Sequence, residues 1–154
     1  MLDRFEKFSY VITEISRYWH KITSDEMEKY GLNGPYSVYI TTLAQFPEGI
    51  TASRLCEMCG RDKADVSRAI SSMEKRGFLR KEGSNYRASI ILTDEGLEVA
   101  RQIGARAKMA VELGGRGLDE AEREVMYRSL ELVASNLKCL SESGIPTGGD
   151  DNEH

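Results

Sequence analysis

The side chains in this 154-residue chain that could do chemistry are basic and small polar groups near its centre, at a spacing that suits contact with DNA. A tight turn at Gly60-Arg61 separates two short segments with helical periodicity. The side chains expected to face outward in this turn and in the first part of the second helix are Arg61, Lys63, Ala64, Ser67, Arg68 and Ser71. Small polar and basic side chains at the start of such a helix can contact base edges in the major groove.

Two apolar faces explain why these side chains are expected to point outward. The apolar face of the first helix consists of Ala52, Leu55, Cys56 and Cys59, and that of the second consists of Val66, Ala69, Ile70 and Met73. We expect Thr51 and Asp62 to cap the two helices and Gly60 to supply the left-handed turn that ends the first. Asp65 is expected to complete a capping box with Asp62.

A β-hairpin is expected after the second helix. Residues 78–82 and 88–92 have the character of two short strands joined by Gly83-Ser84-Asn85, and alternation places Ala88, Ile90 and Leu92 on one face. Arg87 lies beside the tip, from which an arginine can reach a narrow minor groove. The pattern predicts a winged helix-turn-helix in a mostly α-helical chain with a small β-hairpin wing.

Long helices are expected on both sides of this centre. Residues 2–30 carry an apolar stripe formed by Leu2, Phe5, Phe8, Ile12, Ile15, Trp19 and Ile22. Residues 118–140 begin with a capping box of Asp119 and Glu122 and carry a nearly heptad stripe formed by Met126, Leu130, Val133, Leu137 and Leu140. A helix over residues 2–30 would be about 42 Å long, which exceeds what one small domain usually buries. We therefore expect a partner chain to cover part of it, although Thr23-Ser24-Asp25 could interrupt it.

Two further helices complete the expected organisation. One begins with Pro35 at its first position and ends at Pro47-Glu48-Gly49, and the other is capped by Thr93 and stops at Gly114-Gly115. The expected domains are a helical dimerisation domain (residues 1–34 and 97–141), a winged helix-turn-helix domain (residues 35–96) and a disordered acidic tail (residues 142–154).

Charge is distributed unevenly along the chain. The net charge is −4, yet the segment from Arg61 to Arg87 has eight basic and four acidic residues. A basic centre in an acidic protein is compatible with a local DNA-binding face, and a solvated surface of mixed charge is the alternative. Because no run approaches the ~20 apolar residues of a membrane span and no secretory signal is evident, we expect a cytoplasmic protein that does not enter a membrane.

The sequence offers few residues of the types that form catalytic or metal-binding sites. The chain has three cysteines and two histidines, and we find no nucleophile with a base and an orienting group, so we expect no enzyme, no metal and no cofactor. Cys56-x-x-Cys59 could be redox-active or half of a metal site, but both residues lie on an apolar face without a second ligand pair. Core packing is the better interpretation.

Three segments in order resemble the MarR family of transcriptional regulators. They are Gly60-Arg61-Asp62-Lys63-Ala64-Asp65-Val66-Ser67-Arg68, Met73-Glu74-Lys75-Arg76-Gly77-Phe78-Leu79 and Leu92-Thr93-Asp94-Glu95-Gly96. The resemblance covers the chain to about residue 141. It implies a homodimer, usually a repressor, that binds double-stranded DNA at a pseudo-palindromic operator. One departure concerns the wing, where the family commonly has Asp-x-Arg and this chain has Asn85-Tyr86-Arg87 in a shorter loop.

The resemblance also implies that a small aromatic or amphipathic effector binds between the helical domain and the winged helix and changes the separation of the two recognition helices. The candidate ligand residues are Trp19, His20, Tyr36 and Tyr39, for which core or interface positions are the alternative. The rival function is a winged-helix module that binds protein and not DNA. Lys63 and Arg68, which face outward, argue against that rival.

Overall fold

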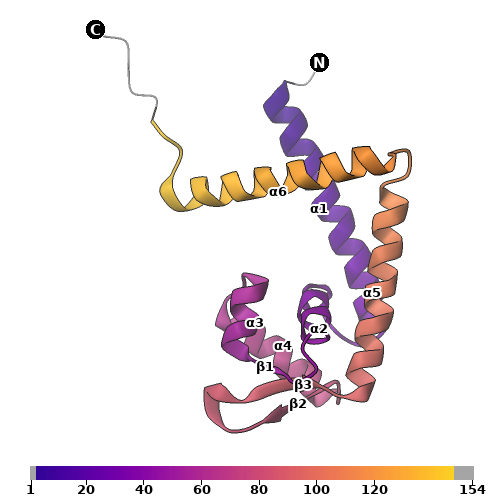
Figure 1. Cartoon of the computed structure of the whole chain (residues 1–154), viewed down its shortest axis with the longest axis vertical. Helices are drawn as coiled ribbons and strands as arrows, with labels where there is room; N and C mark the ends of the chain where they lie inside the picture. Colours follow the sequence, from indigo (N-terminus) through magenta and orange to yellow (C-terminus); the bar gives the residue numbers. More distant parts are fainter. Residues whose placement is uncertain (1–2, 148–154) are drawn as a thin grey trace. The chain divides into compact units, whose positions relative to one another are not determined.

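The computed structural model describes residues 3–147, and within that range the chain is mostly helical with one small sheet (Figure 1). The elements in chain order are α1 (Arg4–Glu28), a 3-10 turn (Gly34–Tyr36), α2 (Ser37–Leu43), β1 (Ile50–Thr51), α3 (Ala52–Cys59), α4 (Lys63–Lys75), β2 (Leu79–Glu82), a second 3-10 turn (Asn85–Arg87), β3 (Ser89–Leu92), α5 (Asp94–Gly114) and α6 (Glu120–Ser143). The expected fold class, a mostly α-helical chain with a hairpin wing, is confirmed.

Side-chain caps fix where the helices begin. Thr51 accepts a hydrogen bond from the backbone of Arg54, and Asp62 accepts one from the backbone of Asp65. Asp119 and Glu122 form the expected reciprocal capping box at the start of α6. These local signals can be recognised from the sequence because each involves residues three positions apart.

Three expectations about the helices need correction. α1 runs without a break through Thr23-Ser24-Asp25, where Lys21 and Asp25 form an ion pair one turn apart. The helix expected from Pro35 to Pro47 begins as a 3-10 turn and its α-helical part ends at Leu43. The capping box expected of Asp65 is wrong, because its carboxylate accepts a hydrogen bond from the hydroxyl of Tyr39 instead.

The sheet has three strands in the order β1-β3-β2, all antiparallel. β2 pairs with β3 so that Leu79 lies opposite Leu92 and Lys81 lies opposite Ile90. The sequence analysis missed β1, in which Ile50 pairs with Ile90. Strand β1 thereby joins the segment before α3 to the wing, so that the helix-turn-helix and the hairpin share one sheet.

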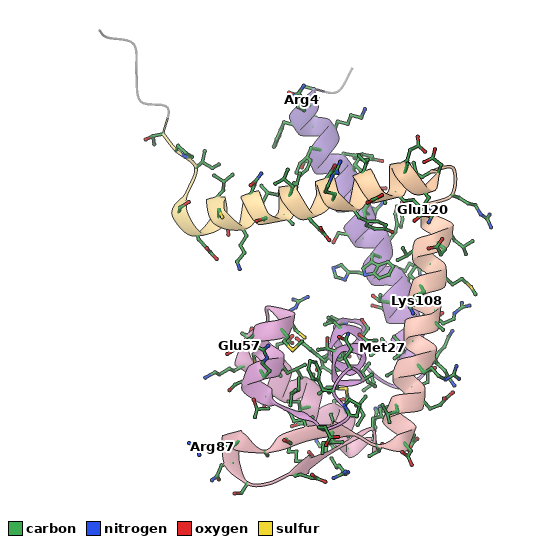
Figure 2. All side chains as sticks on the ribbon, viewed as in Figure 1. Arg4, Met27, Glu57, Arg87, Lys108 and Glu120 are labelled. Atoms are coloured by element: carbon green, nitrogen blue, oxygen red, sulfur yellow. The ribbon has the colours of Figure 1, made fainter. Side chains whose placement is uncertain are left out.

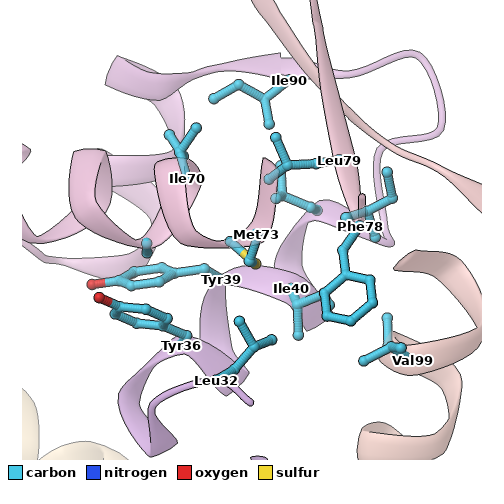
Figure 3. Packing of buried hydrophobic residues seen from close by; sticks show 14 of the residues in the cluster. Leu32, Tyr36, Tyr39, Ile40, Ile70, Met73, Phe78, Leu79, Ile90 and Val99 are labelled. Atoms are coloured by element: carbon cyan, nitrogen blue, oxygen red, sulfur yellow. The ribbon is translucent and has the colours of Figure 1, made fainter. Parts of the chain in front are cut away.

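The core lies where α2, α3, α4 and the sheet meet (Figure 3). All four residues expected on the inner face of α4 are buried, as are Ala88, Ile90 and Leu92 of the wing. Tyr39, Ile40 and Leu43 of α2 and Met27 of α1 complete the same cluster. Polar contacts join α1 and the loop after it to α5: Glu26 pairs with Arg106 at 3.1 Å, and the Tyr30 hydroxyl lies 2.5 Å from the amide oxygen of Gln102.

The contacts within one chain divide it into two compact units, residues 1–110 and residues 111–154. The first unit contains α1, the winged helix and most of α5, whereas α6 belongs to the second. The dimerisation domain expected from residues 1–34 and 97–141 is therefore not one compact unit in the single chain, and it stays a prediction. The helix α6 extends through residues 142 and 143, so any tail starts after them, and residues 148–154 lie outside the described range. Among residues 3–147 no helix is both long and apolar enough to cross a membrane.

Gly96, in the first turn of α5, packs closely against the backbone that follows α4. A Cβ atom on Gly96 would overlap the carbonyl oxygen of Phe78. The same junction is closed by Thr93, whose hydroxyl donates to the carbonyl of Gly77 at 2.6 Å and accepts from the amide of Gly96 at 3.1 Å. Gly104, in the middle of α5, has no such neighbour within 4 Å among the described residues.

We expect Gly96→Ala to lower the free energy of unfolding by about 3 kcal/mol, because the backbone of Phe78 must move to admit a methyl group. Gly104→Ala should instead leave it unchanged or raise it by roughly 0.5–1 kcal/mol, since alanine favours the helix. Urea denaturation of both variants measures the difference. Equal stabilities of the two variants would contradict the close contact at Gly96.

Candidate nucleic-acid interface

The helix α4 carries the candidate base-contacting side chains because its other face is buried. Its buried residues are Val66, Ala69, Ile70 and Met73. The residues on the other side and in the preceding turn are all exposed, and they are Arg61, Lys63, Ala64, Ser67, Arg68 and Ser71. Gly60 adopts the left-handed conformation (φ 60°) that turns the chain from α3 into this helix. The structure therefore brings all six candidates of the helix-turn-helix to one surface.

A hollow of about 270 Å³ lies between α3, α4 and the wing. Its apolar lining includes Cys56, Ile70 and Ile90, and its polar lining consists of Ser53, Lys63, Ser67, Lys81 and Asn85. The sequence analysis did not select Ser53, Lys81 or Asn85. The position of Lys81 near α4 depends on the register of the hairpin, in which Lys81 lies opposite Ile90. That register could not be derived from the sequence.

The wing tip is a 3-10 turn over Asn85–Arg87, entered through Asn85 with a positive φ of 64°. Arg87 lies at the end of the hairpin (Figure 2). Along the strands of the wing, Arg80 pairs with Glu82, and Lys81 lies 3.4 Å from the carboxylate of Glu74. The position of Arg87 suits the minor-groove role expected from the sequence, and that role stays a prediction.

The carboxylate of Asp65 on α4 contacts two other side chains, Tyr39 and Arg68. One of its carboxylate oxygens (Oδ2) accepts a hydrogen bond from the hydroxyl of Tyr39, and the other (Oδ1) lies 3.6 Å from Nη2 of Arg68. Burial of Tyr39, together with the hydrogen bond to Asp65, raises the pKa of the Tyr39 phenol well above its usual range. The phenol therefore stays protonated and donates this hydrogen bond.

The paired cysteines of α3 lie against the core. Cys56 and Cys59 are half-buried and pack against the central cluster, and the thiol of Cys59 lies 3.8 Å from the hydroxyl of Thr42. Within the part of the chain that the structure describes, no group of three histidine, cysteine or acidic side chains could hold a metal ion. The contacts of both cysteines with the core agree with the packing interpretation of Cys56-x-x-Cys59.

The four candidate ligand residues do not meet in one site. Tyr39 is fully buried and Tyr36 nearly so, and their rings pack with centroids 6.1 Å apart. Trp19 and His20 are exposed on α1. A hollow of about 690 Å³ does lie between the end of α1, the 3-10 turn and α4, and its lining includes Ser24, Glu28, Leu32, Tyr36, Asp65 and Arg68. Of the four candidates it includes Tyr36, and sequence reasoning missed the polar residues because they come from three separate elements.

A family model described as the MarR family matches residues 30–86, which contain α2, α3, α4 and most of the wing. Over these residues the chain is similar to the MarR family. It is also similar to the HTH-type transcriptional regulator YybA of Bacillus subtilis, 24% identical over 127 residues, which are 80% of this chain and 84% of that protein.

Solved structures of MarR proteins share the fold of the chain. A MarR protein from Peptoclostridium difficile is similar with a TM-score of 0.78 and 23% identity, covering 89% of this chain and 92% of that one. A MarR-family regulator from Listeria monocytogenes, complexed with a 26mer DNA, is similar with a TM-score of 0.76 and 21% identity, covering 97% of this chain and 100% of that one. At these identities the likeness establishes the fold.

Proposed function

We propose that this protein is a regulator of the MarR family, a homodimeric transcriptional repressor that binds a pseudo-palindromic operator and releases it when a small effector binds. The observation that carries this function is the surface of α4, where the candidate base-contacting side chains are all exposed beside a wing that ends in Arg87. The Listeria protein of similar fold is complexed with DNA, which supports DNA as the ligand of this chain. A cytoplasmic location, where the chromosome lies, follows from this function.

The proposed contacts with DNA fall into three kinds. Lys63, Ser67 and Arg68 enter the major groove from the first half of α4 and contact base edges. Lys63 and Lys81, which line the hollow beside the wing, neutralise backbone phosphate. Arg87 enters the minor groove, where groove width and potential are recognised more than base identity.

Exposed apolar side chains support the proposed dimer. On α1 the large exposed residues include Phe5, at 75% exposure, and Ile15, at 58%. The helix α6 has no buried residue within the described single chain, and Leu130 and Leu137 of its heptad stripe are exposed. A helix with an apolar stripe of this length requires a partner surface, and a second copy of the same chain supplies matching stripes.

The hollow lined by Glu28 and Tyr36 supports a site for the proposed effector. It combines apolar surface from Leu32, Pro35 and Tyr36 with the charged groups of Glu28, Asp65 and Arg68. We propose a small amphipathic compound with a cationic group directed toward Glu28. Because Asp65 and Arg68 belong to α4, such a compound would touch the helix that contacts DNA.

The rival function, a winged-helix module that binds protein, predicts no salt-dependent affinity for duplex DNA. The exposed cations of α4 and the wing favour DNA over that rival, because they match the phosphate backbone in charge. The following experiment decides between the two.

Arg68→Ala is expected to weaken binding to a selected operator by about 1–3 kcal/mol per half-site, because it removes a base contact. Arg87→Ala should weaken binding to operator and scrambled duplex alike and reduce the salt slope by about one. Affinities are measured for both duplexes at several salt concentrations. If Arg68→Ala changes neither affinity, α4 is not the recognition helix; if the wild type binds no duplex in a salt-dependent way, the rival function is favoured.

Leu137→Glu is expected to weaken the dimer by about a hundredfold or more, because it places a charge in the apolar stripe of α6. Ser135→Glu is the matched control, since helical periodicity places Ser135 on the face opposite the stripe. Analytical ultracentrifugation at micromolar concentration measures both variants. A wild type that sediments as a folded monomer would refute the dimer.

Glu28→Gln is expected to weaken binding of a cationic amphipathic compound about tenfold, because it removes the carboxylate that faces the cation. The compounds are first selected from a library as those that raise the melting temperature of the protein and release bound operator. Glu14→Gln, on the same helix, is the control and should bind them as the wild type does. Equal affinities for all three proteins would place the effector elsewhere.

A further inference from the structure

We infer that Tyr39 is a positioning residue for DNA recognition: through the carboxylate of Asp65 it holds Arg68 in the orientation that contacts a base. The inference deepens the proposed function and depends on it. Sequence reasoning had placed Tyr39 among the ligand candidates and Asp65 in a capping box, and neither assignment accounts for the contact between them.

The two oxygens of the Asp65 carboxylate have different partners. Oδ2 accepts the hydrogen bond from Tyr39, which lies 26 residues away in the sequence, and Oδ1 faces Arg68 at 3.6 Å. Because a carboxylate is planar, fixing one oxygen also fixes the direction of the other. The hydrogen bond from the hydroxyl of Tyr39 therefore determines the position of Oδ1, the oxygen of Asp65 that faces Arg68.

Tyr39 is a rigid anchor for this contact. Its side chain is completely buried, packs against the ring of Tyr36, and belongs to the cluster that also holds α4 (Figure 3). Arg68, by contrast, exposes 66% of its side chain. The contact thus connects a buried core residue on α2 to an exposed side chain on the surface of α4 that is proposed to bind DNA.

Holding Arg68 beside Asp65 should favour base contact in two ways. A long side chain that is already ordered loses less conformational entropy when it binds a base. The negative charge of Asp65 also repels phosphate, so Arg68 gains less from contacts with the backbone, which are independent of sequence. Both effects raise the affinity for the operator relative to scrambled DNA.

The alternative is that the Tyr39–Asp65 hydrogen bond contributes to stability alone. That alternative predicts a lower melting temperature with an unchanged ratio of operator to scrambled affinity, measured where every variant is folded. The two interpretations therefore differ in the selectivity ratio.

Tyr39→Phe is expected to lower this selectivity ratio about tenfold, through loss of operator affinity, while affinity for scrambled duplex and its salt slope stay unchanged. Tyr30→Phe is the matched control, because it removes a tyrosine hydrogen bond, to Gln102, that involves neither Asp65 nor α4, and it should retain the wild-type ratio. Asp65→Asn should lower the ratio as well, but with higher affinity for scrambled duplex, because a negative charge near the phosphates is lost.

A double-mutant cycle tests whether Tyr39 acts through Arg68. In an Arg68→Ala background, Tyr39→Phe should have no further effect on the ratio. An equal effect in both backgrounds, or a Tyr39→Phe protein with wild-type selectivity, would overturn the inference. If Tyr39→Phe does not fold, the same cycle with Asp65→Asn decides the question.

The controls also separate this inference from the proposed function. A wild type without selective, salt-dependent binding would overturn both. A selective wild type whose ratio is unaffected by Tyr39→Phe would overturn the positioning role alone.

Discussion

Burial of one face of α4 is the constraint on which the arrangement of the surface proposed to bind DNA depends. Val66, Ala69, Ile70 and Met73 can leave water together only in one rotational setting of the helix. That setting exposes Lys63, Ser67 and Arg68 and directs the start of α4 away from the core. The cap at Asp62 and the left-handed Gly60 then determine where along its axis the helix begins.

The buried face of α4 also packs into the same core as the strands of the wing. Ile70 and Ile90 line one hollow, and Ile90 pairs with Ile50 in β1 and lies opposite Lys81 in β2. A change in the packing of α4 would therefore reach the strands that carry the wing tip. The hairpin and α4 are held by one core and not by a flexible connection.

Sequence reasoning succeeded where the determining contacts are local. The caps of α3, α4 and α6 and the apolar faces of the helices depend on residues three or four positions apart, and all were predictable. It failed where the partner is distant. The role of Asp65 depends on Tyr39, and β1 depends on pairing with a strand about 40 residues later, so neither leaves a local pattern.

The candidate site was predictable to a similar extent and for the same reason. Exposure of the α4 candidates follows from helical periodicity, whereas Lys81 and Ser53 became candidates only when the hairpin register and the packing of α3 were known. Glu28 lines the hollow of about 690 Å³ because the end of α1 contacts the 3-10 turn at Gly34–Tyr36. Composition and spacing do not reveal that contact.

The lack of any buried residue in α6 of the described single chain has a consequence for how much active regulator a cell contains. If the proposed dimer supplies the missing core, folding of this helix is linked to assembly, and the fraction of assembled protein rises with the number of chains per cell by mass action. Dilution would then lower the amount of DNA-binding protein in two ways. It would separate the chains, and it would destabilise the helices that become exposed after separation. Such a regulator would respond to its own abundance more steeply than one whose monomer is stable.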